Sequence, residues 1–243
     1  MTFYVPGEVI KSSRLPGVRI LGYGLEKTPG GVGFCVVQPG VLQTDDKQQA
    51  WISIHSKRYI PQLGDHVVGV VTSRAGELYK VDIGSADQAY ISFLSFEGAT
   101  KRNRPNLGVG DVLYARIVRA SRHLEPELSC VDAELKSRGM GKLEDGFVFK
   151  ISTNHARRLL RASCRLLKLI GEQIRFEIAV GINGKIWIKS DDLNKTMKIY
   201  ELITKAESVL DQNVQHFVHV TLKPPSEEQS MNVDKQEDGQ IDD

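Results

Sequence analysis

The alternation of hydrophobic and polar positions changes twice along the chain and divides it into three regions. In residues 1–60, short apolar runs alternate with glycine- and proline-containing turns about every ten residues, which is typical of a small all-β unit. Residues 61–136 show the period of two that strands require. Beyond residue 137, segments with helical period appear. We therefore expect domains at residues 1–60, 61–136 and 137–225, followed by a tail at 226–243.

The middle region predicts five strands joined by short turns, except for one long polar connection after the third. The strands cover residues 66–72, 78–83, 89–93, 111–120 and 127–131. In the second of them, Tyr79, Val81 and Ile83 fall on one face, and Lys80 and Asp82 on the other. Five short strands with a long third connection are the pattern of a five-stranded OB barrel.

The third region predicts the order β, α, β, β, α, which is that of a KH domain. Strands are expected at 147–151, 174–180 and 185–189, and helices at 154–170 and from about 193 to 210. Thr153 or Asn154 would cap the first helix and Gly171 would end it. The first two KH helices are then either continuous or separated by a short turn near Arg161-Ala162-Ser163. The fold class is mostly β with an α+β C-terminal domain.

Charge is distributed unevenly along the chain. The formal net charge of +2 combines +8 on residues 1–225 with −6 on residues 226–243, a tail without aromatic residues that we expect to be disordered. A basic body suits a polyanionic partner, although ordinary solvated lysines would give the same count.

No apolar run approaches the roughly 18 residues of a membrane span, the start lacks the features of a secretory signal, and three distant cysteines form no disulfide framework. We expect an intracellular protein with no membrane contact.

The sequence contains few of the residue patterns that an enzyme would need. No phosphate-binding GxxxxGK[ST] motif is present, and the six histidines are scattered. The adjacent pairs Asp45-Asp46 and Asp191-Asp192 point their side chains apart and do not make a two-metal cluster. We expect no catalytic residue, no metal and no cofactor.

The candidate nucleic-acid residues lie in loops of the barrel. OB barrels bind single strands through a basic groove and stacking aromatic residues. Lys101, Arg102 and Arg104 lie in the long third connection with no acid between them, so they predict either RNA contact or a solvated or subunit-docking loop. Arg74 and Arg122 lie in two further loops. The aromatic candidates are more often core residues than stacking platforms: Tyr79, Tyr90, Phe93 and Phe96.

The segment Gly181-Ile182-Asn183-Gly184 looks like the GxxG loop with which KH domains clamp an RNA backbone. That loop belongs between the first two helices, whereas this segment lies between two strands. We therefore interpret Gly181, Asn183 and Gly184 as a structural turn, with Asn183-Gly184 supplying positive φ for a two-residue type I′ hairpin.

Several blocks together resemble a known family. They are SKRYIP (56–61), GDHVVGVV (64–71), YKVDIG (79–84), FEGATKRNRP (96–105), VGD (109–111) and VGINGKIWIK (180–189). Over residues 1–210 the chain resembles the S1/KH cap subunits of the eukaryotic RNA exosome, most closely the exosome component three type, and that family shares the GxNG feature. The acidic tail lies outside the resemblance.

The resemblance implies a non-catalytic subunit of a hetero-oligomer. Cap proteins of this family sit with other cap subunits on a ring of RNase-PH-like subunits, stabilise it and guide single-stranded RNA into its channel. Separate ribonucleases then carry out 3′–5′ degradation and processing, including that of rRNA. The implied location is the nucleus, with nucleolar enrichment, and the cytoplasm. The alternative is a free-standing S1/KH RNA-binding protein in translation or ribosome assembly.

Overall fold

The computed structural model describes residues 2–12, 17–22, 24–31, 33–45, 48–54, 58–121, 124–209 and 213–222. The chain divides into two compact units, Met1–Tyr59 and Ile60–Asp243. Among the described residues, none of the helices combines the length and the apolar character needed to cross a membrane.

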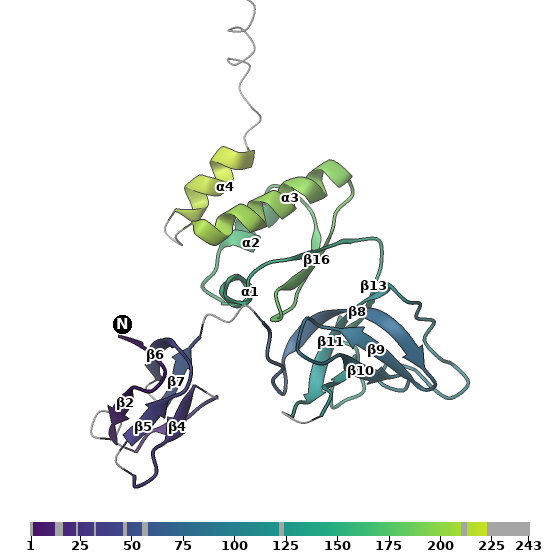
Figure 1. Cartoon of the computed structure of the whole chain (residues 1–243). Helices are drawn as coiled ribbons and strands as arrows, with labels where there is room; N and C mark the ends of the chain where they lie inside the picture. Colours follow the sequence, from purple (N-terminus) through teal and green to yellow (C-terminus); the bar gives the residue numbers. More distant parts are fainter. Residues whose placement is uncertain are drawn as a thin grey trace, which may run out of the picture. The chain divides into compact units, whose positions relative to one another are not determined.

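The N-terminal unit is built from two small sheets (Figure 1). One sheet has the order β1 (Phe3–Tyr4), β6 (Gly40–Asp45), β7 (Gln49–Ser53) and β3 (Arg19–Ile20). The other has the order β2 (Val9–Lys11), β5 (Gly33–Val36) and β4 (Leu25–Lys27). Side chains from both sheets share one core, which contains Ile10, Leu25, Phe34, Val36, Ala50 and Ile52. The described part of this region is all β, as its turns predict.

The second unit begins with a closed five-stranded barrel. Its strands are β8 (His66–Ala75), β9 (Leu78–Asp82), β10 (Ala89–Ser92), β11 (Val112–Arg119) and β12 (Glu127–Ser129). They pair in the order β12-β10-β9-β8-β11, and β11 also pairs with β12, which closes the barrel. The β10–β12 pair is parallel and the others are antiparallel. The barrel predicted from the alternation is therefore confirmed.

One strand of this sheet was not predicted. β13 (Gly141–Leu143) pairs with the first half of β11, so that Val112 lies opposite Leu143 and Tyr114 opposite Gly141. Three residues, of which only Leu143 is a large apolar residue, are too few to show an alternation.

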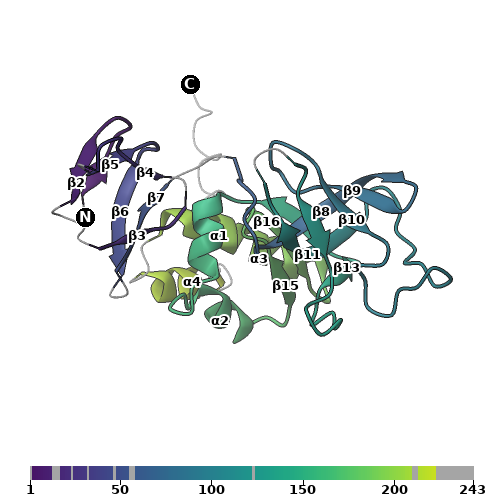
Figure 2. The ribbon, with the colours of Figure 1, turned by 90° about the horizontal axis from the view of Figure 1, so that it is seen from below.

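The KH domain follows, and in the part of the chain that the structure describes it combines a three-stranded antiparallel sheet with helices (Figure 2). The sheet has the order β14 (Phe147–Lys150), β16 (Lys185–Lys189) and β15 (Glu177–Val180). The helices are α1 (Thr153–Leu159), α2 (Leu166–Gly171), α3 (Leu193–Lys205), which a 3₁₀ turn (Ala206–Ser208) extends, and α4 (Val214–Leu222). All of these elements contribute to one core, in which Ile170, Ile186, Ile188 and Ile199 are fully buried.

The helix limits decide between the two alternatives for the first KH helices. The helices are separated, as one alternative expected near Arg161-Ala162-Ser163, because residues 160–165 lie between α1 and α2; a continuous helix over 154–170 is excluded. Ser152 is the N-cap, and its hydroxyl accepts the N–H of His155 at 3.1 Å. The apolar period runs through the break because Leu159, Leu166 and Ile170 enter the same core from two helices. The second long helix ends at Lys205 and not near residue 210, and α4 was not predicted.

Candidate nucleic-acid interface

The three clustered cations lie in a compact loop, residues 98–105, which we call the basic loop. Asn103 closes it: the N–H of Thr100 donates to the Asn103 carbonyl at 2.9 Å, and the N–H of Asn103 donates to the Thr100 hydroxyl at 3.0 Å. The Asn103 side-chain amide donates to the Gly98 carbonyl at 3.3 Å. With the loop held in this way, Lys101, Arg102 and Arg104 are exposed.

Two aromatic rings orient the guanidinium groups at this end of the barrel. Arg104 lies over the Phe93 ring at 4.6 Å from its centroid, and Arg74 lies over Tyr79 at 5.7 Å. The Tyr79 hydroxyl donates to the Pro105 carbonyl at 3.0 Å, which joins β9 to the basic loop. Tyr79 and Phe93 are each 2% exposed, so both are core residues. Their rings position cations on the surface.

These cations have no acidic partner in the described part of the chain. None of the ion pairs between described residues involves Lys101, Arg102, Arg104 or Arg74. By contrast, two basic residues elsewhere on the barrel are neutralised: Lys80 pairs with Glu125 at 3.7 Å, and Arg119 with Glu127 at 3.5 Å. A cluster of unpaired cations produces a positive potential that attracts phosphate.

The remaining candidates have separate environments. The Tyr90 hydroxyl donates to the Glu127 carboxylate at 3.1 Å, and partial burial together with this carboxylate raises the pKa of Tyr90. Phe96 is half-buried next to the basic loop. Arg122 lies outside the described residues, so its proposed role in RNA contact remains a prediction.

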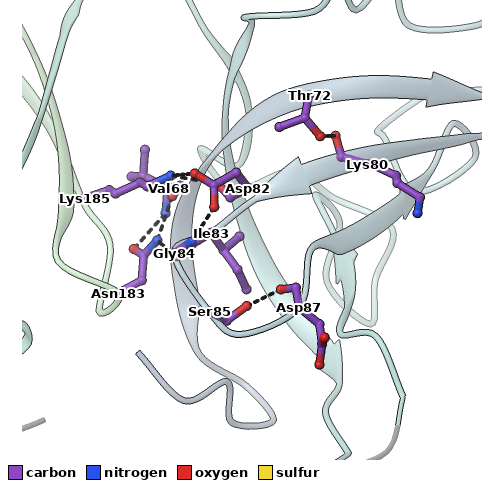
Figure 3. A network of polar contacts seen from close by, with 10 residues as sticks. All are labelled: Val68, Thr72, Lys80, Asp82, Ile83, Gly84, Ser85, Asp87, Asn183 and Lys185. Atoms are coloured by element: carbon purple, nitrogen blue, oxygen red, sulfur yellow. Dashed lines mark hydrogen bonds and ion pairs between the residues drawn. The ribbon is translucent and has the colours of Figure 1, made fainter. Parts of the chain in front are cut away.

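The GxNG segment joins the KH domain to the barrel, and we call this contact the domain joint (Figure 3). Asn183 is 2% exposed. Its side-chain amide donates to the carbonyls of Val68 and Ile83, both at 2.8 Å, and its Oδ1 accepts the N–H of Val68 at 3.4 Å. The N–H of Ile182 donates to the His66 carbonyl at 3.0 Å. The β15–β16 turn is thereby connected to two positions of the barrel strand β8, His66 and Val68, and to Ile83, which follows β9.

The turn differs in type from the sequence-based expectation. The N–H of Gly184 donates to the Gly181 carbonyl at 3.0 Å, so Ile182 and Asn183 are its central residues. Neither has a positive φ, whereas Gly184 has φ +82°. The hairpin is therefore a turn of the type I class followed by a left-handed glycine, and the type I′ assignment is wrong. This geometry directs the Asn183 side chain toward the barrel.

An ion pair lies beside the joint and was missed by sequence reasoning (Figure 3). Lys185 Nζ donates to the Asp82 carboxylate at 2.6 Å and to the Asp82 carbonyl at 2.9 Å. Burial alone would raise the pKa of Asp82, but hydrogen bonds from Lys185 and from the N–H of Gly84 outweigh it and hold this pKa below its usual value. The alternation shows that Asp82 faces away from the barrel core, and nothing local shows that Lys185 lies opposite.

Comparison with known families agrees with this arrangement. Residues 59–141 match the family described as the S1 domain of exosome complex component RRP40, and residues 146–194 match a KH domain family. The crystal structure of a candidate exosome complex RNA-binding protein aligns with a TM-score of 0.54 at 25% identity, covering 68% of this chain and 97% of that one. The chain is thus an S1/KH protein of the exosome type.

Comparison with curated relatives identifies the family within this class of S1/KH proteins. The exosome complex component RRP40 of Drosophila melanogaster is 42% identical over 213 residues, covering 85% of this chain and 89% of that protein. The Schizosaccharomyces pombe protein is 40% identical over 218 residues, covering 87% and 91%. The human protein is 41% identical over 169 residues, a match that covers 69% of this chain and 62% of the human protein. The chain belongs to the exosome complex component RRP40 family.

Proposed function

We propose that this protein is a non-catalytic, RNA-binding cap subunit of the RNA exosome, of the component three type. It stabilises a ring of RNase-PH-like subunits together with other cap subunits and guides single-stranded RNA into the channel for 3′–5′ degradation and processing. Family membership supports the assembly, since the curated relatives are named as exosome components. The proposed location is the nucleus, including the nucleolus, and the cytoplasm.

The basic loop is the RNA contact in this proposal. The observation that carries it is the group of exposed cations at one end of the barrel, none of which is ion-paired within the described residues. Arg104 and Arg74 rest on buried rings, so little side-chain freedom is lost when they bind phosphate. We assign Lys101, Arg102 and Arg104 to phosphate contacts, with Arg74 and Arg122 as further cations on the path.

The test is the salt dependence of RNA binding by the assembled complex. Single-stranded RNA binding releases roughly 0.7 counterions per neutralised phosphate. Replacing Lys101, Arg102 and Arg104 by Ala should therefore reduce the log–log salt slope by about 2. Exposed loop changes of this kind shift stability by no more than about 0.5 kcal/mol each. The matched control replaces three exposed lysines of the KH domain by Ala and should leave the slope unchanged: Lys168, Lys195 and Lys198.

Two outcomes would contradict the assignment. An unchanged slope in the assembled complex would mean that the basic loop does not face phosphate. If the triple variant no longer joins the ring while the isolated chain binds RNA with an unchanged slope, the basic loop is a docking element. Membership of the complex is checked separately by size-exclusion of native extract, in which the protein should elute with the ring and not as a monomer.

A further inference from the structure

A polar hollow lies on the barrel at the end of β8 opposite to the basic loop. Its volume is about 310 Å³, and it is lined by His66, Tyr114, Arg116, Asp132, Arg138 and Met140. His66 begins β8 and Arg74 lies eight residues further along the same strand, which corresponds to roughly 26 Å at 3.3 Å per residue. We call this site the barrel hollow; it is separate from the basic loop.

Strand register brings the side chains of the barrel hollow together. Along β11 the burial alternates, with Leu113, Ala115 and Ile117 in the core. Tyr114 and Arg116 therefore project from the outer face of the barrel. Arg116 lies directly opposite His66 in the antiparallel β8–β11 pair, and Tyr114 is one diagonal step away.

The barrel hollow has an aromatic wall. The rings of His66 and Tyr114 are stacked, with centroids 5.8 Å apart and planes inclined by 29°. Tyr114 is half-buried, whereas His66 is exposed, so one face of the stack is open to a ligand. Burial and the nearby charge of Arg116 lower the pKa of His66, with Asp65 opposing, which favours the uncharged imidazole. A flat, uncharged ring at a surface suits stacking on a base.

The charges of the barrel hollow leave one cation without a partner. Arg138 is neutralised by Asp132 and Glu134, each at 2.8 Å. Arg116 has no ion pair or hydrogen bond to any other residue that the structure describes, and its guanidinium lies over the turn at Gly64. One unpaired guanidinium can bind one phosphate group. The Asp132 carboxylate, already compensated by Arg138, remains able to accept an amino group.

We propose that the barrel hollow holds one nucleotide of single-stranded RNA, with the base against His66 and the phosphate at Arg116. A volume of about 310 Å³ is at the lower end of small-ligand pockets and suits one unpaired base with its sugar. A free nucleoside di- or triphosphate is less suitable, because it would need several cations or a phosphate-binding loop. This inference rests on the proposed function and adds a second contact, far from the basic loop.

The test uses a fluorescein-labelled adenylate dodecamer, titrated by anisotropy against the full chain and the assembled complex. Arg116→Gln should lower the affinity and reduce the log–log salt slope by roughly 0.7, the value for one phosphate. His66→Ala should lower the affinity at least about five-fold, which is the lower limit expected for the loss of one ring that stacks on a base. The salt slope should not change. Arg116→Lys should restore the slope. Arg175→Gln, an exposed arginine of the KH domain, is the control with the same change in charge.

The outcomes separate this inference from the proposed function. If Arg116→Gln and His66→Ala bind like the wild type while the basic-loop triple variant still loses slope, the barrel hollow is not an RNA site and the proposed function stands. If the wild-type assembled complex does not bind the dodecamer, both fail. Adenosine monophosphate serves as the free-nucleotide probe: if it competes at micromolar concentration, the barrel hollow is a nucleotide pocket and the inference of an RNA contact is wrong. Thermal melting of each variant identifies loss of folding, and the two substitutions are independent tests.

Discussion

Replacing Gly181 by Ala should disrupt the domain joint by displacing a neighbouring side chain. A Cβ at position 181 would collide with Asn183 Oδ1, and it would lie 2.6 Å from the Val68 nitrogen and 3.0 Å from the Lys185 carbonyl oxygen. The last two are backbone atoms of paired strands and cannot move far. The Asn183 side chain must therefore leave its site, although position 183 is unchanged, and the turn must also shift away from β8 to relieve the contact with the Val68 nitrogen.

The cost follows from the hydrogen bonds that Asn183 makes. Its departure leaves the carbonyls of Val68 and Ile83 unpaired in a buried site, and each buried group without a partner costs about 1–3 kcal/mol. Because water can enter part of the space, while the contact with the Val68 nitrogen adds strain, we expect a loss of at least about 3 kcal/mol in the free energy of unfolding. For a unit of this size, 1 kcal/mol corresponds to roughly 2–4 °C, so the melting temperature should fall by at least about 6–12 °C.

A single tryptophan can report on this joint. The chain has two tryptophans. Trp187 is buried in a cluster that contains Val68 of the barrel and Ala179 of the KH domain, and Trp51 lies in β7 of the N-terminal unit. In a Trp51→Phe background, urea unfolding followed by fluorescence therefore measures the loss of the contact between barrel and KH domain.

A double-mutant cycle decides the mechanism. If Gly181→Ala acts by expelling Asn183, then adding Asn183→Ala should cost little more, and the two effects should be strongly non-additive. Gly108→Ala is the control, because its Cβ would meet only the Asp111 carboxylate at 3.8 Å and its φ is ordinary. It should change stability by no more than about 0.5 kcal/mol. Additive losses, or a Gly181→Ala variant as stable as this control, would refute the argument.

Three further predictions concern the turn, its ion pair and the absence of catalysis. Gly184→Ala places a Cβ at φ +82° and 2.5 Å from the Ile151 oxygen. It should lower the free energy of unfolding in urea by at least about 1–3 kcal/mol. The loss should exceed that of Gly110→Ala, where φ is +94° and the space around the Cβ is open. Normal melting with lost RNA affinity would instead indicate an RNA clamp. Because the folded pKa of Asp82 is lowered, its contribution to stability is present above the unfolded value of about 4 and is lost as pH falls through the folded value. Asp82→Asn should therefore flatten the acid limb of a stability-against-pH curve, and an unchanged limb would mean that the ion pair with Lys185 contributes nothing. The purified chain should leave labelled single-stranded RNA intact with magnesium, manganese or phosphate, and cleavage that copurifies through two orthogonal columns would refute the non-catalytic assignment.

The barrel could be predicted because its signal is local. In β9, Tyr79 and Val81 are buried while Lys80 and Asp82 are only partly so, which is the pattern that the sequence alternation predicts. The apolar period alone could not decide whether the first two KH helices are continuous or separated. Cys164 and Leu167 pack against the core on either side of Arg165, so the apolar period continues where the backbone leaves the helix. A periodicity reports which side chains are buried and does not report whether the backbone hydrogen bonds are continuous.

The candidate site was predictable in composition and not in arrangement. Three cations within four residues are visible in the sequence, but Asn103 between them gives no sign that it closes the basic loop. The position of Arg74 beside this loop depends on the hydrogen bond between Tyr79 and Pro105, which are 26 positions apart. The partners of Asn183 are more distant still, because Val68 lies 115 positions away. The turn pattern in the sequence identifies Gly184 as a turn residue. The hydrogen bonds of its neighbour Asn183 are made with the barrel, a different domain, and therefore cannot be identified from the turn.

The position of the GxNG segment explains why RNA binding and stability should respond to different mutations. In KH domains that clamp RNA, the glycine loop lies between the first two helices, where its backbone amides can face phosphate. Here the connection over residues 160–165 contains no glycine, and the amide of Asn183 is used on carbonyls of the barrel. The joint fixes the His66 end of β8, and the basic loop lies near its Arg74 end. The polar groups of the joint are already hydrogen-bonded within the chain, so changes at the joint should appear first in unfolding. The charges of the basic loop have no such partners, so changes in the basic loop should appear in the salt dependence of RNA binding.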